Sequence, residues 1–127
     1  MMSLPVQEVA DRARAYCEAL HWSDETVFED MCHENFLMTY VGQDGQGRFI
    51  DKSAFVDRVA ARDAFAGEPS YHIETVDVAG HGIAHVKLWV DMPPRRFEDY
   101  LGFFHVGGEW KLITKLFRVA SGPALEG

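Results

Sequence analysis

The sequence predicts an α+β fold in which helices pack on one face of a single bent, mostly antiparallel sheet. The first half of the chain contains three segments with helical spacing of apolar residues, whereas residues 71–119 read almost entirely as strands. The strongest strand segment, 97–119, has two aromatic-rich runs on either side of Gly107-Gly108, which is typical of a β-hairpin. We expect this hairpin to form the centre of the sheet.

Length and composition limit the organisation and the partners. The 127 residues fit one domain, 1–127, with a core over about 6–119 and a flexible tail at 120–127. The formal net charge of -8 argues against nucleic acid or an anionic membrane as the main partner. We see neither a signal-peptide pattern nor an apolar run of membrane-spanning length, so we expect a cytoplasmic protein.

Three helices follow from apolar periodicity and capping residues. The first covers residues 6–20, and its buried stripe contains Val6, Val9, Ala10, Ala13, Tyr16, Cys17 and Leu20. A second, shorter helix is expected after a cap at Ser23, burying Val27, Phe28 and Met31. Asp51 is placed to cap a third helix, in which the buried positions are Phe55, Val56, Val59 and Ala60.

The strands are predicted from β-rich runs between turn signals. Residues 36–41 read as the first strand, 42–47 as a loop, and 71–78 and 83–91 as two strands that precede the break at Pro93-Pro94. In 83–90 the even positions are uniformly apolar, so this face should meet the helices. In the last strand Trp110, Leu112, Thr114 and Leu116 form the more apolar face, and the other face is mixed, as suits a subunit interface.

Cysteine and histidine give little indication of chemistry. Cys17 and Cys32 form no Cys-x-x-Cys motif and are interpreted as buried apolar residues rather than as redox groups. His33 is interpreted as a helix-end residue, with a catalytic base as the alternative. His81 and His85 have no carboxylate cluster beside them, so we expect no metal and no cofactor.

Asp99 and Lys115 are unusual because each places a charge in the middle of a central strand. Their relation depends on the hairpin register. A three-residue loop, 106–108, sets Asp99 opposite Lys115 as a salt bridge and Phe104 beside Trp110, and we favour this register. A two-residue Gly107-Gly108 turn instead sets Lys115 opposite Tyr100.

Several short motifs, in a fixed order, resemble a known superfamily. They are Tyr16, Cys32-His33-Glu34-Asn35, Phe55-Val56-Asp57-Arg58-Val59, Asp77-Val78-x-Gly80, Asp99-Tyr100-Leu101, Gly108-Glu109-Trp110 and Lys115. Over residues 6–119 the chain resembles the nuclear transport factor 2-like (cystatin-like) superfamily, and within it the putative lumazine-binding, SnoaL-like group. The resemblance implies a cone-shaped half-barrel whose curved sheet wraps three helices and leaves a pocket, and a homodimer formed through the outer sheet face.

The leading functional hypothesis is a pocket for a small apolar or aromatic molecule. Aromatic residues available to line it, together with Lys115, are Tyr16, Phe28, Tyr40, Phe55, Phe65, Tyr100 and Phe104. The second hypothesis is a cofactor-free acid–base enzyme, a cyclase, isomerase or dehydratase, that uses Asp99, Tyr16 or His33. Tyr16 lies where the related ketosteroid isomerases have an oxyanion-donor tyrosine, but 36–40 lacks their carboxylate base. We therefore interpret Tyr16 as a core or pocket-wall residue whose hydroxyl is hydrogen-bonded, rather than as a catalytic group. The third is an assembly module with a filled cavity, binding its copy through Trp89, Phe103 and Phe117.

Overall fold

The computed structural model describes residues 3–125 and contains three helices and six strands. In chain order they are α1 (Leu4–Trp22), α2 (Glu25–Met31), β1 (Cys32–Val41), β2 (Gly47–Asp51), α3 (Lys52–Ala60), β3 (Tyr71–Ala79), β4 (Ile83–Met92), β5 (Arg95–Val106) and β6 (Glu109–Ser121). The predicted order of helices and strands is confirmed, and β2 is the one element without a predicted counterpart. None of the helices in the described part of the chain is long and apolar enough to cross a membrane.

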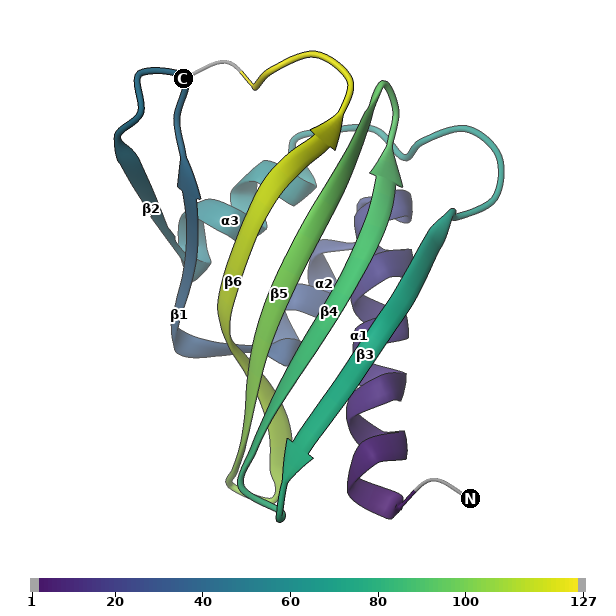
Figure 1. Cartoon of the computed structure of the whole chain (residues 1–127), viewed down its shortest axis with the longest axis vertical. Helices are drawn as coiled ribbons and strands as arrows, with labels where there is room; N and C mark the ends of the chain where they lie inside the picture. Colours follow the sequence, from purple (N-terminus) through teal and green to yellow (C-terminus); the bar gives the residue numbers. More distant parts are fainter. Residues whose placement is uncertain (1–2, 126–127) are drawn as a thin grey trace.

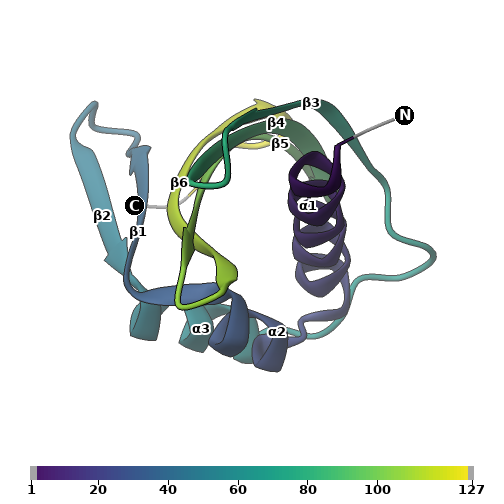
Figure 2. The same cartoon turned by 90° about the horizontal axis from the view of Figure 1, so that it is seen from below.

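The strands form one curved sheet in the order β2-β1-β6-β5-β4-β3. Neighbouring strands are antiparallel except for β1 and β6, which are parallel. Figure 1 shows the β5–β6 hairpin in the middle of the sheet, as predicted. In Figure 2 the sheet bends into an arc with all three helices on its concave side, α1 against β3 and β4, and α3 against β1. This is the predicted α+β half-barrel, and the sheet does not close.

Capping side chains define where the helices begin. The Ser3 side chain accepts a hydrogen bond from the Val6 amide at 3.4 Å, and Asp51 accepts one from the Ala54 amide at 2.9 Å, which confirms the third cap. The prediction that Ser23 caps α2 is wrong. Ser23 ends α1 in the left-handed conformation (φ 55°), and Asp24 caps α2 by accepting from the Thr26 amide at 3.2 Å.

The predicted face of β4 is confirmed, because Ala84, Val86, Leu88 and Val90 are all buried. The predicted faces of β6 are wrong beyond Leu112, and a β-bulge is the reason. The turn is the two-residue Gly107-Gly108, with Val106 opposite Glu109. Phe103 then pairs with Leu112 but Gly102 pairs with Thr114, so Ile113 is an extra residue.

The bulge exchanges the two faces of β6 for the rest of the strand. Lys115 and Phe117 turn toward the helices, and Leu116 turns outward with 51% of its surface exposed. Neither predicted register holds in this part: Lys115 lies opposite Leu101, and Asp99 lies opposite Phe117. Phe104 faces Lys111 rather than Trp110. Asp99 and Lys115 are therefore diagonal neighbours on the concave face.

This register also corrects the residues expected at the outer sheet face. Phe103 is buried in the core, and Phe117 points inward against Tyr40 and Phe97. Trp89 is the one of the three that lies on the outer face, where the Arg96 guanidinium covers its ring at 3.6 Å. Phe103 and Phe117 cannot form an interface at the outer face, because both side chains point into the interior.

The C-terminal segment was predicted to be a flexible tail, but strand pairing and hydrogen bonds hold it as far as Leu125. Ala120 and Ser121 still belong to β6, and the Arg95 guanidinium donates to the Pro123 and Ala124 carbonyls at 2.8 and 3.1 Å. The Gln43 side chain donates to the Leu125 carbonyl. Leu125 packs against the core, and residues 126–127 of the predicted tail lie outside the described part.

Candidate functional site

A cavity of about 280 Å³ opens on the concave side of the sheet. Its apolar walls come from every layer of the fold: Leu20 of α1, Phe55 of α3, Phe65 after α3, Val90 of β4, Phe97 of β5 and Phe117 of β6. Because side chains do not fill this space, the expectation of an assembly module with a filled interior is wrong in that respect. Cavities that are mostly apolar with a few polar groups are the usual form of small-molecule sites.

The acid in this cavity is Asp99, and only 1% of it is exposed. Its Oδ2 accepts a hydrogen bond from the Tyr16 hydroxyl, and its Oδ1 has no partner among the described residues. Burial raises the pKa of Asp99, and the nearby Lys115 charge and the Tyr16 bond oppose that shift. Burial and the Asp99 charge also raise the pKa of Tyr16. Burial thus favours the neutral, proton-holding form of Asp99, and the Tyr16 bond and the Lys115 charge limit this effect.

Lys115 is the matching buried base, with 7% of it exposed. Its ammonium nitrogen lies 5.2 Å from the ring centre of Tyr16, 4.9 Å from Phe55 and 5.2 Å from Phe117. Burial lowers the pKa of Lys115, and the Asp99 charge opposes the shift. The predicted Asp99–Lys115 salt bridge is wrong, because no ion pair within 4.0 Å joins them. Aromatic faces, rather than a carboxylate, surround this cation.

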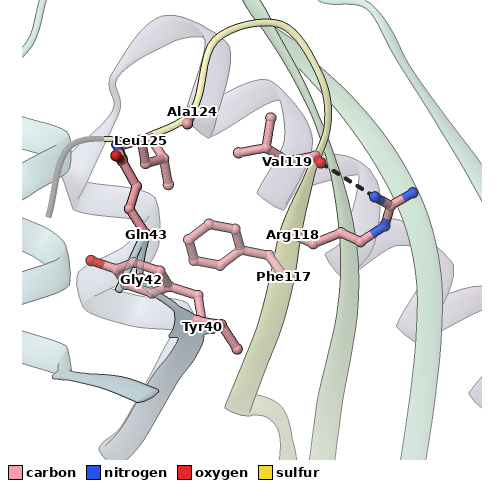
Figure 3. A pocket seen from close by; sticks show the side chains of 9 residues that line it. Tyr40, Gly42, Gln43, Phe117, Arg118, Val119, Ala124 and Leu125 are labelled. Carbon is pink, nitrogen blue, oxygen red and sulfur yellow. Dashed lines mark hydrogen bonds between the residues drawn. The ribbon is translucent and has the colours of Figure 1, made fainter. Parts of the chain in front are cut away.

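A second hollow of about 240 Å³ adjoins the cavity. Figure 3 shows Tyr40 and Phe117 side by side in it, with Val119 and Leu125 above, and the two rings stack with centres 4.8 Å apart. Phe117 and Leu125 line both spaces, so these two side chains form the partition between them. Tyr40, predicted as a ligand contact, lies in this second hollow.

The structure brings some of the sequence candidates together and separates others. Phe55, Phe65, Asp99 and Lys115 line the cavity. Tyr16 and Phe28 are fully buried one layer behind its wall, where their rings meet edge to face at 5.7 Å. Tyr16 therefore reaches the site through its hydroxyl bond to Asp99 rather than by direct lining.

Three candidates lie away from the cavity. Tyr100 is 41% exposed on the outer sheet face, where its ring stacks on His85 at 5.1 Å. Its even position in β5 puts it on the face opposite Asp99. Phe104 and His33 meet each other at 5.1 Å, and the His33 Nδ1 accepts from the Asn35 amide at 3.0 Å. These corrections remove Tyr100 and Phe104 as ligand contacts and His33 as a base in this site.

Three basic residues of the cavity were not predicted from the sequence, namely Arg58, Arg62 and Arg95. A signal for two of them was available. Arg58 and Arg62 follow Phe55 in the sequence at helical spacing. This spacing predicts that both arginines lie on the same face of the segment as the buried Phe55. Arg95 follows Pro93-Pro94 and gave no such indication. Within residues 3–125 no group of His, Cys, Asp and Glu is arranged to hold a metal ion.

The architecture and the cavity define a class, the nuclear transport factor 2-like α+β proteins with a conical interior. The chain belongs to the family described as "Putative lumazine-binding", whose model matches residues 5–118. Nothing among the curated proteins matches the chain.

Solved structures agree with this assignment at the level of the fold. A nuclear transport factor 2-like protein of unknown function from Shewanella baltica OS155 is 16% identical, with a TM-score of 0.85 over 96% of this chain and 100% of that one. One from Silicibacter pomeroyi DSS-3 is 20% identical, with a TM-score of 0.81 over 90% and 94%. A ketosteroid isomerase-like protein from Erwinia carotovora atroseptica SCRI1043 is 12% identical, with a TM-score of 0.74 over 95% and 100%. At these identities the likeness concerns the fold alone.

Proposed function

We propose that this protein binds a small, largely apolar or aromatic molecule in the cavity between the helices and the sheet. The observation that carries the proposal is the composition of that cavity. Phenylalanine side chains form much of the wall, and Asp99 and Lys115 belong to the lining. Oδ1 of Asp99 has no hydrogen-bond partner among the described residues, and the ammonium group of Lys115 lies among aromatic rings. Aromatic walls suit a flat ligand, and a few buried polar groups would fix its orientation. The name of the family is in keeping with this proposal.

The test is a binding experiment with a matched variant. Native mass spectrometry of the freshly purified protein should retain a ligand mass, or isothermal titration with a ribityl lumazine, a flavin and a series of one- and two-ring aromatics should give saturable heat. Val90→Phe places a ring in the cavity and should abolish the signal while thermal unfolding stays cooperative. Absence of binding by all compounds, or equal binding by the Val90→Phe variant, would contradict the proposal.

A second candidate function is acid–base catalysis, and the Tyr16–Asp99 pair is the observation that favours it. A carboxyl group whose pKa is raised in an apolar cavity holds a proton that it could donate to a bound substrate. If a substrate is found by binding, Asp99→Asn should abolish its turnover and retain its binding. Unchanged turnover in that variant would remove the enzyme hypothesis.

We also propose that two copies associate through the outer face of the sheet. An outer apolar patch, formed by Leu37, Phe49, Tyr100 and Leu116, supports this proposal. Leu116 lies opposite Tyr100 on one side and beside Thr39 on the other, and Thr39 lies opposite Phe49, so the patch crosses four adjacent strands. Contiguous exposed apolar side chains of this kind are typical of protein interfaces.

A further inference from the structure

Within residues 3–125 most basic side chains form ion pairs, and the few that form none lie together. There are 12 Lys and Arg residues against 20 Asp and Glu. Eight of the basic side chains form ion pairs within residues 3–125. The four that form none there are Arg58, Arg62, Arg95 and Lys115, and all four line the cavity. Acidic residues outnumber basic ones in this chain, yet these four basic side chains form no ion pair among the described residues and lie in one cavity. We take this as an indication that the cavity binds an anion.

The lining of the cavity therefore has a positive net charge. Asp99 is its single acid. If Asp99 and Lys115 are both ionised their charges cancel, and if both are neutral they contribute nothing. The three arginines stay protonated in proteins, so their charge remains in either case.

One of these guanidinium groups, that of Arg62, has an N–H donor without an acceptor among the described residues. Arg62 donates one bond to the Leu20 carbonyl at 3.0 Å, and its buried Nε has no acceptor among the described residues. Lys115 is more than nine-tenths buried, and its surroundings are aromatic rings. Buried donors without acceptors cost free energy, and an ionised acceptor satisfies them best.

We propose that the ligand of this cavity is an aromatic carboxylate, with its ring system against Phe55, Phe65 and Phe97 and its carboxylate toward Arg62 and Lys115. This inference rests on the proposed function and specifies the chemical class of the ligand. The cavity volume of about 280 Å³ lies near the lower end of the range of small-molecule pockets, which suits one or two rings. Arginine presents a planar fork of N–H donors that matches the two oxygens of a carboxylate.

The test compares two ligands of the same shape, 2-naphthoate and 2-naphthamide, by isothermal titration at neutral pH. The wild-type protein should bind the naphthoate roughly tenfold or more tightly, as expected for a charge-assisted hydrogen bond. Arg62→Gln should remove most of this preference. Arg48→Gln is the matched control, because it makes the same change at a surface residue paired with Asp44, outside the cavity, and it should keep the preference.

Failure of this inference and failure of the proposed function give different results. If neither compound binds the wild-type protein, the proposed pocket function itself is contradicted, and this inference with it. If both bind equally, the pocket function stands and the carboxylate specificity is overturned. A preference that persists in Arg62→Gln, and also in Arg58→Gln and Lys115→Met, would overturn it as well. The two ligands are compared first on the wild-type protein. That comparison can contradict the carboxylate specificity even if one of the variants fails to fold.

Discussion

The hydroxyl of Tyr16 donates a hydrogen bond to Oδ2 of Asp99, and this bond joins the middle of α1 to the central strand β5. Both residues are buried, and the bond is the one hydrogen bond that either side chain makes among the described residues. It therefore ties the helix to the sheet beside the cavity, and it opposes the rise in the Asp99 pKa that burial causes.

Tyr16→Phe should destabilise the protein by about 1–3 kcal/mol, because a buried carboxyl group then loses its hydrogen-bond donor. The expected loss comes from Asp99 rather than from packing, since the ring is retained. Urea unfolding measures it as a lower transition midpoint at an unchanged slope.

Tyr71→Phe is the control for this change. It removes the hydroxyl bond between Tyr71 and Glu18 at 3.0 Å, which lies at the surface, and should cost less than about 0.5 kcal/mol. If both variants lose the same free energy of unfolding, burial of Asp99 does not make the Tyr16 hydrogen bond more stabilising than a bond at the surface.

The raised pKa of Asp99 predicts a pH dependence of a definite sign. The folded protein holds this proton more firmly than the unfolded chain, so the group favours folding below its unfolded pKa. Its contribution is lost as the pH rises from about 4 through the raised pKa of the folded state, by about 1.4 kcal/mol for every tenfold difference in proton affinity between the folded and unfolded states. Asp44 and Asp91, whose pKa values are lowered by Arg48 and Arg96, act with the opposite sign.

Asp99→Asn isolates this contribution, because the amide oxygen still accepts from Tyr16 and carries no charge. The free energy of unfolding of the variant minus that of the wild type should increase as the pH rises from about 4 to about 8. We would measure both proteins by urea unfolding across that range. A difference that stays constant or decreases would show that Asp99 is not held in its neutral form by folding.

The local features of this fold could be predicted from sequence, because each depends on residues close together in the chain. The Asp51 cap and the apolar face of β4 required only neighbouring positions. The faces of β6 could not be predicted in the same way, because regular alternation from Trp110 to Leu116 is plausible until Ile113 is recognised as an extra residue. Gly102 was the available signal, since a glycine inside a strand often marks a bulge.

The candidate site depends on that bulge. It turns Lys115 and Phe117 to the concave face, where Asp99 already lies by the regular alternation of β5. There Asp99 meets Tyr16, which is 83 positions away in the sequence. Asp99, Tyr16 and Lys115 could be recognised in the sequence as unusual residues, but the salt bridge predicted there is replaced by the tyrosine–carboxyl bond. Such a contact is set by strand register and by helix docking, and neither can be inferred from spacing alone.

The two cysteines should be unreactive in the folded protein. Cys17 and Cys32 are buried, and burial raises the pKa of both thiols, that of Cys32 to about 12. A thiol-specific disulfide reagent at about pH 8 should modify neither residue in native protein and both in urea. Modification of one native thiol at the rate of a free cysteine would contradict the buried apolar interpretation of that residue.

The proposed dimer predicts that one charge in the outer apolar patch produces monomers. Leu116→Glu places a carboxylate in the middle of the patch, opposite Tyr100, so association would bury an unpaired charge. Sedimentation velocity should give a dimer for the wild type and a monomer for the variant, with an unchanged circular dichroism spectrum because Leu116 is 51% exposed.

Leu4→Glu is the matched control for this prediction. Leu4 is also an exposed leucine, 67% exposed, but it lies in the first turn of α1, away from the patch. The control adds the same charge and should leave the dimer intact. A monomeric wild type would contradict the proposed association, whereas a dimer that survives Leu116→Glu would place the contact elsewhere. If both variants dissociate, the added net charge, rather than its position in the patch, is what opposes association.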